Sequence, residues 1–115
     1  MKGSGVMLIV SQLGEIKLTR GDTAWLTVTI TRDTGELYEI QNDDTLTLSV
    51  KKKITDKEYA FKKEVKGKDT FHIEPKDTEN LYFGCYKYEV QVTTKDGDVY
   101  TVIEPTTFEL LEEVT

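Results

Sequence analysis

Alternation of apolar and polar residues is the feature that most constrains this chain. Within residues 24–31 an aliphatic side chain recurs at every second position, and the set is Ala24, Leu26, Val28 and Ile30. A period of two places alternate residues on opposite faces of a β-strand, whereas a helix needs spacings of three and four. Residues 46–50 and 86–92 repeat the pattern. The sequence therefore predicts strands.

Composition supports the same prediction. The 115 residues include 17 threonines and only two alanines. Threonine suits a pleated surface, whereas alanine is the best helix former. One helical turn is expected within residues 74–81, where Pro75 follows a short strand. A chain of this length is typical of one domain that buries its core without disulfides or metal.

Turn signals divide the chain into short strands. They lie at residues 33–35, 55–57, 67–69 and 95–98. Roughly seven to eight strands at this spacing predict an all-β fold, an immunoglobulin-like antiparallel β-sandwich, with a small barrel as the alternative. We place this domain at residues 14–112 and an N-terminal arm at residues 1–13. Pro105 is expected to interrupt the last pairing.

One local pattern favours the sandwich over the barrel. Asp77, Gly84, Tyr86 and Tyr88 follow one another as at the corner between strands E and F of immunoglobulin domains. Tyr86 would then bond through its hydroxyl to backbone within residues 74–81. Tyr88 would take the position of the second cysteine of antibody domains. The alternative is that both tyrosines are ordinary strand residues.

Strand parity also predicts which side chains share the core. The predicted core residues are Leu26, Val28, Ile30, Leu48, Tyr88, Val90 and Phe108. Trp25 has the opposite parity and is expected to point outward, where a loop or a neighbouring chain should cover it. Trp25 is therefore one candidate interface residue.

The arm supplies the other candidate interface residues, Met7, Leu8 and Ile9. They belong to the longest uncharged apolar run, Val6–Val10, which is too short to span a membrane and too weakly preceded by basic residues to be a secretory signal. Leaving it in water would forfeit about 1.5–3 kcal/mol for each large side chain. It should therefore pair with a sheet edge of its own chain or of a neighbouring subunit; we favour the neighbour, which would make the protein a homo-oligomer.

Charge is unevenly distributed. The net charge is −6, yet Lys51–Lys68 holds eight lysines against three acidic residues, a local charge of +5 that leaves −11 for the rest. The overall balance argues against a nucleic-acid partner. The lysines either protect a sheet edge from further pairing or mark a partner surface.

Catalytic and metal-binding patterns are not evident. Cys85 and His72 are the only cysteine and histidine, so neither an internal disulfide nor a multi-cysteine zinc site can form. Phosphate loops and serine elbows do not occur. The paired aspartates at residues 43–44 and 96–98 are typical of turns, not of a calcium loop. We expect no enzyme, no metal and no cofactor.

The chain resembles phage and prophage small immunoglobulin-like structural proteins, and among them it is similar to the N-terminal domain of phage baseplate upper proteins. The resemblance spans about residues 14–112. The motifs that carry it are Ile16–Thr23 with the strand after it, Asp33–Gly35, Leu46–Lys53, Glu74–Thr78 with Leu81, Gly84, Tyr86 and Tyr88, and Asp96–Thr101. The sequence departs from the baseplate pattern because it has no coiled-coil heptads.

The resemblance implies a non-enzymatic module that joins protein components of a phage tail or baseplate. Such a protein would be made in the bacterial cytoplasm and then reside in the virion, without a membrane or nucleic-acid partner. The alternative is a sandwich that binds a carbohydrate or a host surface through exposed aromatics, for which Trp25, Tyr38 and Tyr82 are the candidates.

Overall fold

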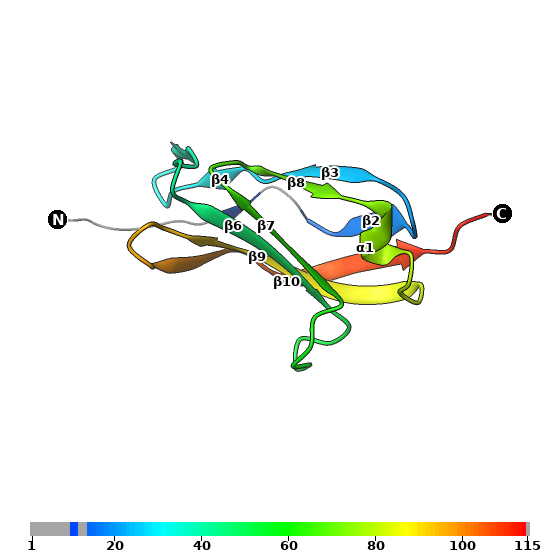
Figure 1. Cartoon of the computed structure of the whole chain (residues 1–115). Coiled ribbons are helices and arrows are strands. Elements are labelled where there is room, and N and C mark those ends of the chain that lie inside the picture. The colour runs from blue at the N-terminus through cyan, green and yellow to red at the C-terminus, as the bar shows by residue number, and fades with distance from the viewer. Residues whose placement is uncertain (1–9, 12–13, 115) are drawn as a thin grey trace.

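The computed structural model describes residues 10–11 and 14–114. These residues form two layers of strands and one short helix (Figure 1). One layer is a sheet in the order β2 (Ile16–Thr19), β10 (Val99–Leu111), β9 (Gly84–Thr93), β6 (Thr45–Lys51) and β7 (Phe61–Lys66). The all-β prediction is confirmed.

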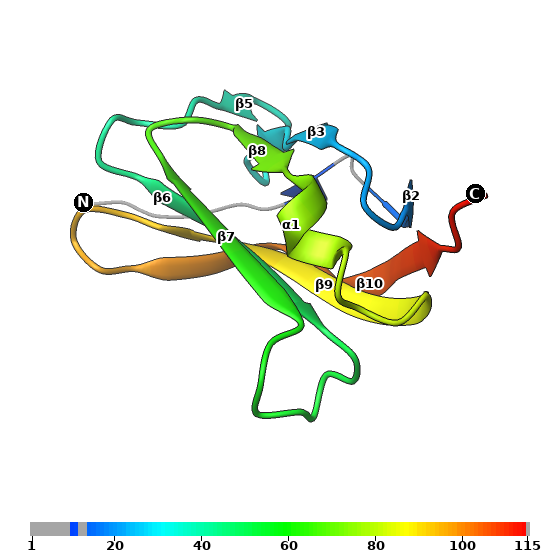
Figure 2. The same cartoon turned by 45° about the vertical axis from the view of Figure 1, so that its right-hand side comes forward.

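The second layer is divided in two. It consists of the pair β3 (Ala24–Thr27) and β8 (Thr70–Ile73), and of the order β1 (Val10–Ser11), β4 (Ile30–Thr31) and β5 (Leu37–Tyr38). Figure 2 shows β3, β5 and β8 on one side of the molecule and the larger sheet on the other. The helix α1 (Pro75–Thr78) connects β8 to β9, as predicted from Pro75.

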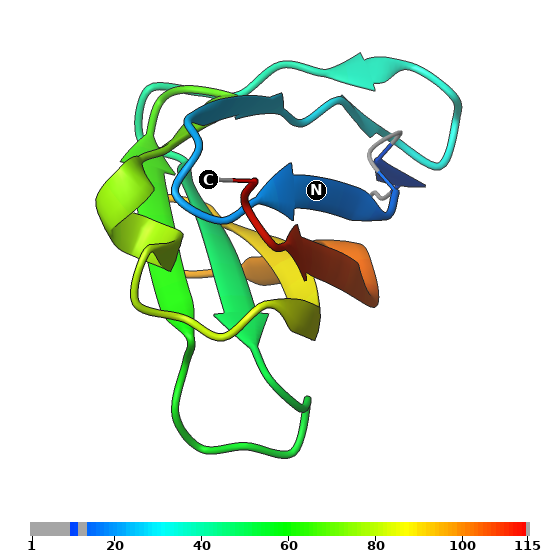
Figure 3. The ribbon, with the colours of Figure 1, turned by 90° about the vertical axis from the view of Figure 1, so that its right-hand side faces the viewer.

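One edge of the larger sheet differs from the predicted antiparallel arrangement. β2 pairs with β10 in parallel, with Ile16 opposite Phe108 and Thr19 opposite Leu111. The neighbouring pairs β10–β9, β9–β6 and β6–β7 are antiparallel. Parallel strands need a long connection, and β2 and β10 are separated by most of the chain. Seen along the long axis, the sheet curls so that β2 approaches the second layer (Figure 3).

The core lies between the two layers. Val28, Ile30, Leu48, Tyr88, Val90 and Phe108 are buried as predicted. Leu26 is the exception, because it packs against the rim of this core and is only partly buried. Strand parity therefore identified the correct face at each of these positions.

The alternation of residues 24–31 suggests one continuous strand, but the structure divides them between two ladders. Residues 24–27 pair with β8, the Val28 N–H donates to the Asp69 carbonyl at 2.8 Å, and residues 30–31 pair with β5. β5 itself comprises only two residues. The chain therefore exchanges one hydrogen-bonding neighbour for another near Val28.

Pro105 does not end a strand, because β10 continues through it to Leu111. The register with β9 shifts between Thr101 and Ile103 and again between Ile103 and Thr106. Proline cannot donate to a ladder, so it is tolerated where a bulge removes that need. The predicted interruption is thus a local irregularity within one long strand.

Candidate functional site

Trp25 lies on the outer face of the β3–β8 pair and is 67% exposed. The strand register places it opposite His72, and the two rings stack with centroids 3.9 Å apart and planes 3° apart. Thr27 and Thr70 form the next pair on this face, with their hydroxyl oxygens 3.0 Å apart. The outward direction of Trp25 is confirmed. Within the part of the chain that the structure describes, the ring stacks on a strand neighbour and no loop covers it. Its coverage by a neighbouring chain stays a prediction.

The N-terminal arm enters the described structure only at its end. Val10 pairs with Thr31 and Ser11 with Ile30, which adds β1 to the edge of β4. This is the first of the two placements predicted for the arm, pairing with its own sheet. The candidate interface residues Met7, Leu8 and Ile9 lie outside the described residues.

The two tyrosines of the predicted corner point their hydroxyls at backbone. The Tyr86 hydroxyl donates to the Tyr82 carbonyl at 2.6 Å, one residue beyond the segment that we predicted. The Tyr88 hydroxyl donates to the Gly14 carbonyl, which ties the central strand to the segment before β2. Burial raises the pKa of Tyr88 to about 12 and also raises that of Tyr86. Both side chains are therefore held as neutral donors.

Gly84 adopts a φ of +139°, which side chains rarely allow. A Cβ at this position would come within 3.3 Å of the Lys52 ammonium. That ammonium donates to the Cys85 carbonyl at 3.3 Å and lies 4.7 Å from the centre of the Tyr86 ring. Gly84 thus leaves space for Lys52, which comes from the loop between β6 and β7.

Asp77 caps α1 and binds a lysine. Its carboxylate accepts from the Glu74 N–H at 2.8 Å and pairs with Lys63 of β7 at 2.8 Å, and Lys63 also contacts Glu74 at 3.2 Å. Burial lowers the pKa of Lys63, but its hydrogen bonds to Asp77 and Glu74 outweigh this and leave the pKa raised. Sequence reasoning missed this contact. The available signal was a lysine on the otherwise apolar face of Phe61 and Val65.

The loop between β6 and β7 forms a lysine-rich surface, which we name the basic hairpin (residues 51–62). Lys51 donates to the Asp56 carbonyl at 2.6 Å, and Lys51 and Lys62 lie 4.9 Å and 5.0 Å from the centre of the Tyr59 ring. Among the described residues, ion pairs involve Arg20, Lys63 and Lys76 and none of the lysines of this hairpin. Carbonyls and aromatic rings contact the ammonium groups of Lys51, Lys52 and Lys62. With Asp56 and Glu58, the hairpin carries a net charge of +3.

An open cavity of about 580 Å³ lies between the basic hairpin and the segment before β9. Tyr59, Leu81 and Tyr82 provide apolar surface. Lys52 and Lys57 provide positive charge, and Asp56 and Glu58 provide negative charge. Tyr82 is 85% exposed. The cavity thus combines charged side chains of both signs with exposed aromatic rings.

The structure bears on the first of the two roles considered for the lysine stretch. β7 is an edge strand, and its Lys62 and Lys66 are exposed there, as edge protection requires. Lys52, Lys53 and Lys57 lie instead in the loop, where there is no ladder to protect. For these loop lysines a partner surface stays a prediction.

Tyr38 is half-buried, unlike the other two aromatic candidates. Its hydroxyl donates to the buried Asp44 carboxylate at 2.5 Å. Burial, together with this bond, raises the pKa of Tyr38 to about 12. Of the three aromatic candidates, Trp25 and Tyr82 remain exposed.

The described residues contain no group of three or more His, Cys, Asp or Glu side chains that could hold a metal ion. They also contain no helix long and apolar enough to cross a membrane. Cys85 is exposed on the outward face of β9.

No family model matches the sequence, and no curated protein matches it.

Proposed function

We propose that the chain is an immunoglobulin-like β-sandwich that serves as a non-enzymatic interaction module of a phage tail or baseplate. The two-layered strand arrangement supports the fold proposal, as does the bond from Tyr86 to upstream backbone early in β9. The motifs that resemble phage structural proteins support the functional proposal.

The observation that carries the proposal is the exposed Trp25. A tryptophan that is 67% exposed on a flat strand pair is costly for a protein that works alone, and tryptophan is enriched where partners bury it. His72 fixes the ring in one orientation by stacking, so little conformational entropy is lost when a partner covers it. This face is therefore suited to contact with another protein.

The proposed partners are proteins of the same particle. The chain would be made in the bacterial cytoplasm, assembled without a cofactor, and retained in the virion. Met7, Leu8 and Ile9 of the arm stay the other candidate interface residues, with no nucleic acid or membrane involved.

The test begins with purified phage particles from the source lysate, probed with antibody against this chain and by mass spectrometry. We expect the chain in stoichiometric amounts in intact particles, and loss of its incorporation in the Trp25→Ala variant with an unchanged melting temperature. Thr27→Ala is the matched control on the same face. Absence from the particles, or normal incorporation of Trp25→Ala, would contradict the proposal.

A carbohydrate site is the second candidate, because the Thr27 and Thr70 hydroxyls lie on the same outer face as the Trp25 ring. Trp25 is the only tryptophan, so its fluorescence reports directly on this surface. Quenching or a spectral shift on titration with bacterial wall polysaccharide would favour this candidate. A shift with particle proteins alone would favour the first.

A further inference from the structure

A second surface of the chain is acidic and complements the basic hairpin. We name residues 33–44 the acidic hairpin: they hold five carboxylates and no lysine or arginine. Asp44 is buried against Tyr38, whereas Asp33, Glu36, Glu39 and Asp43 are exposed. The ion pairs of the described residues do not include any of these four.

The acidic hairpin also presents an apolar side chain. Leu37, the first residue of β5, follows Glu36 and is 67% exposed. The nearest cation in sequence, Arg32, lies 5.1 Å from the centre of the Tyr38 ring and forms no ion pair with the hairpin. This surface therefore presents an exposed leucine among carboxylates that form no ion pair among the described residues.

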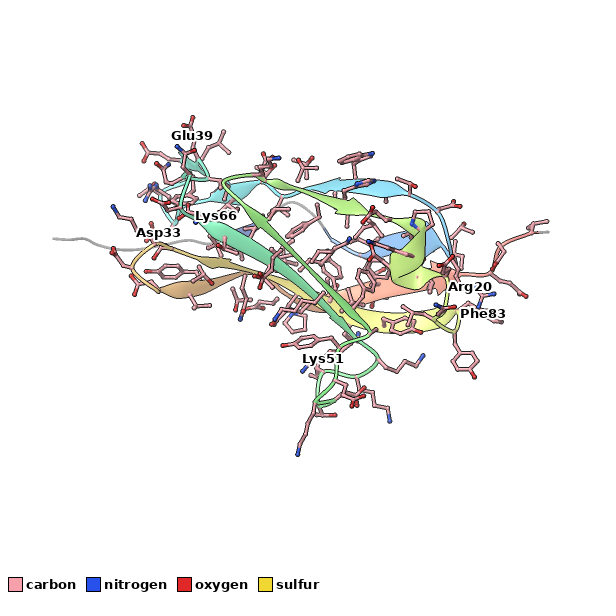
Figure 4. All side chains as sticks on the ribbon, in the orientation of Figure 1. Arg20, Asp33, Glu39, Lys51, Lys66 and Phe83 are labelled. Atoms are coloured by element: carbon pink, nitrogen blue, oxygen red, sulfur yellow. The ribbon has the colours of Figure 1, made fainter. Side chains whose placement is uncertain are left out.

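The two hairpins face away from each other in one molecule. Figure 4 shows Asp33 and Glu39 at one end, while the loop after Lys51 projects from the opposite side. Figure 2 places β5 and this loop on opposite sides as well. Lys66 also lies at the acidic end, on the same side as Asp33 and Glu39, so that end holds one lysine beside its carboxylates. A single copy cannot bring the hairpins together.

We propose that the acidic hairpin of a second copy of this chain docks in the cavity beside the basic hairpin. Leu37 of one copy would lie between Tyr59 and Tyr82 of the other. Glu36 and Glu39 would then face Lys52 and Lys57, which form no ion pair among the described residues although Asp56 and Glu58 line the same cavity.

Charge complementarity selects a second copy as the occupant. The basic hairpin holds five lysines against Asp56 and Glu58, a net charge of +3, and the acidic hairpin holds five carboxylates, a net charge of −5. Each copy therefore offers both halves of the contact. Two different surfaces meet, which makes the contact head-to-tail: it leaves one surface of each kind open and closes only in a ring. This inference does not depend on the proposed phage role.

Sedimentation velocity from about 10 µM to about 1 mM tests it. We expect association that rises with concentration at about 50 mM salt and falls at about 500 mM, because salt shortens the range of charge attraction. A monomer across the whole range at low salt would overturn the proposal.

Two charge-reversal variants identify the surfaces. Lys53→Glu with Lys57→Glu alters the basic hairpin and leaves Lys52 in contact with Cys85; Glu36→Lys with Glu39→Lys alters the acidic one. We expect each variant alone to be monomeric and an equimolar mixture of the two to associate again. Rescue on mixing shows that both variants are folded. The control, Lys17→Glu with Glu104→Lys, changes exposed strand residues outside both hairpins and should associate like the parent.

Leu37→Ala tests the apolar contact separately. Loss of a buried leucine side chain should weaken association about tenfold or more at either salt concentration. Association that survives both reversals but is lost in Trp25→Ala would overturn this proposal and assign self-association to the tryptophan surface. The proposed particle role would still be tested separately, by the presence of the chain in purified particles.

Discussion

The two layers differ in how their hydrogen-bonded ladders continue. β9 keeps β6 on one side and β10 on the other along most of its length. Residues 24–31 instead pass from β8 to β5 near Val28. Burial nevertheless alternates without a break across this change, and Val28 and Ile30 are each 2% exposed. Sequence periodicity therefore reports the face that a side chain takes and not the strand that its backbone joins.

The largest expected difference between the layers is in their leucines. Leu48 is fully buried in β6, whereas Leu26 packs at the rim from β3. Leu48→Ala should lower the free energy of unfolding by about 2–5 kcal/mol, because it removes contacts and leaves a cavity. Leu26→Ala should cost clearly less, since solvent already reaches the site. Urea unfolding measures both variants. Equal losses of unfolding free energy would show that the two leucines contribute equally to the core, whichever layer they come from.

The next effect concerns the ion pair that links β7 of the larger sheet to the helix after β8. Lys63→Met keeps the aliphatic stem but leaves Asp77 without its cation and Glu74 with only its 3.7 Å pair to Lys76. We expect a loss of about 1–2 kcal/mol, between the values for exposed pairs and for bonds to buried charges. Lys66→Met, on the exposed face of the same strand, is the control and should change urea unfolding little.

The tyrosine hydroxyls should contribute less. Tyr88→Phe and Tyr86→Phe each remove one hydrogen bond, worth about 0.5–1.5 kcal/mol. The Tyr88 bond reaches Gly14 across the fold, while the Tyr86 bond spans four residues. Hydrogen exchange should therefore show that Tyr88→Phe exposes β2 amides and that Tyr86→Phe does not. Identical exchange patterns would show that Tyr88 does not hold β2.

Alkaline pH gives a second measure of Tyr88. Its folded pKa is raised from 10.0 to about 12, so the folded state holds the proton more tightly than the unfolded state. The resulting stabilisation is complete below about pH 10 and is lost as the pH rises towards 12. The difference in unfolding free energy between the parent and Tyr88→Phe should shrink over this interval. A constant difference would contradict the assigned pKa.

The smallest effect is expected on the exposed face of the divided layer. Trp25→Ala removes a stacked but solvent-facing ring, and the stability should fall by about 0.5 kcal/mol or less. Thermal unfolding measures this. A loss comparable with that of Leu48→Ala would make Trp25 a core residue and remove the argument for a partner.

Side-chain direction was the predictable part of this molecule. The outward Trp25 and the inward Val90 follow from parity alone, because successive side chains alternate faces whatever the neighbouring strand is. The parallel pairing of β2 with β10 does not, since it joins segments far apart in the sequence. The Lys63–Asp77 contact is equally non-local. The cavity beside Tyr82 forms only where two distant loops meet, so no local pattern marks it.

The parallel edge formed by β2 and β10 determines how the domain carries mechanical load. The chain enters β2 at Ile16 and leaves β10 at Leu111, and these strands run side by side in the same direction. A pull between those two points slides one strand along the other and strains all of their hydrogen bonds at once, whereas a hairpin pulled at its open end separates bond by bond. The Arg20 N–H bond to the Leu111 carbonyl and the Arg20–Glu113 ion pair reinforce the same junction. Tension applied between Ile16 and Leu111 therefore loads the β2–β10 hydrogen bonds in shear.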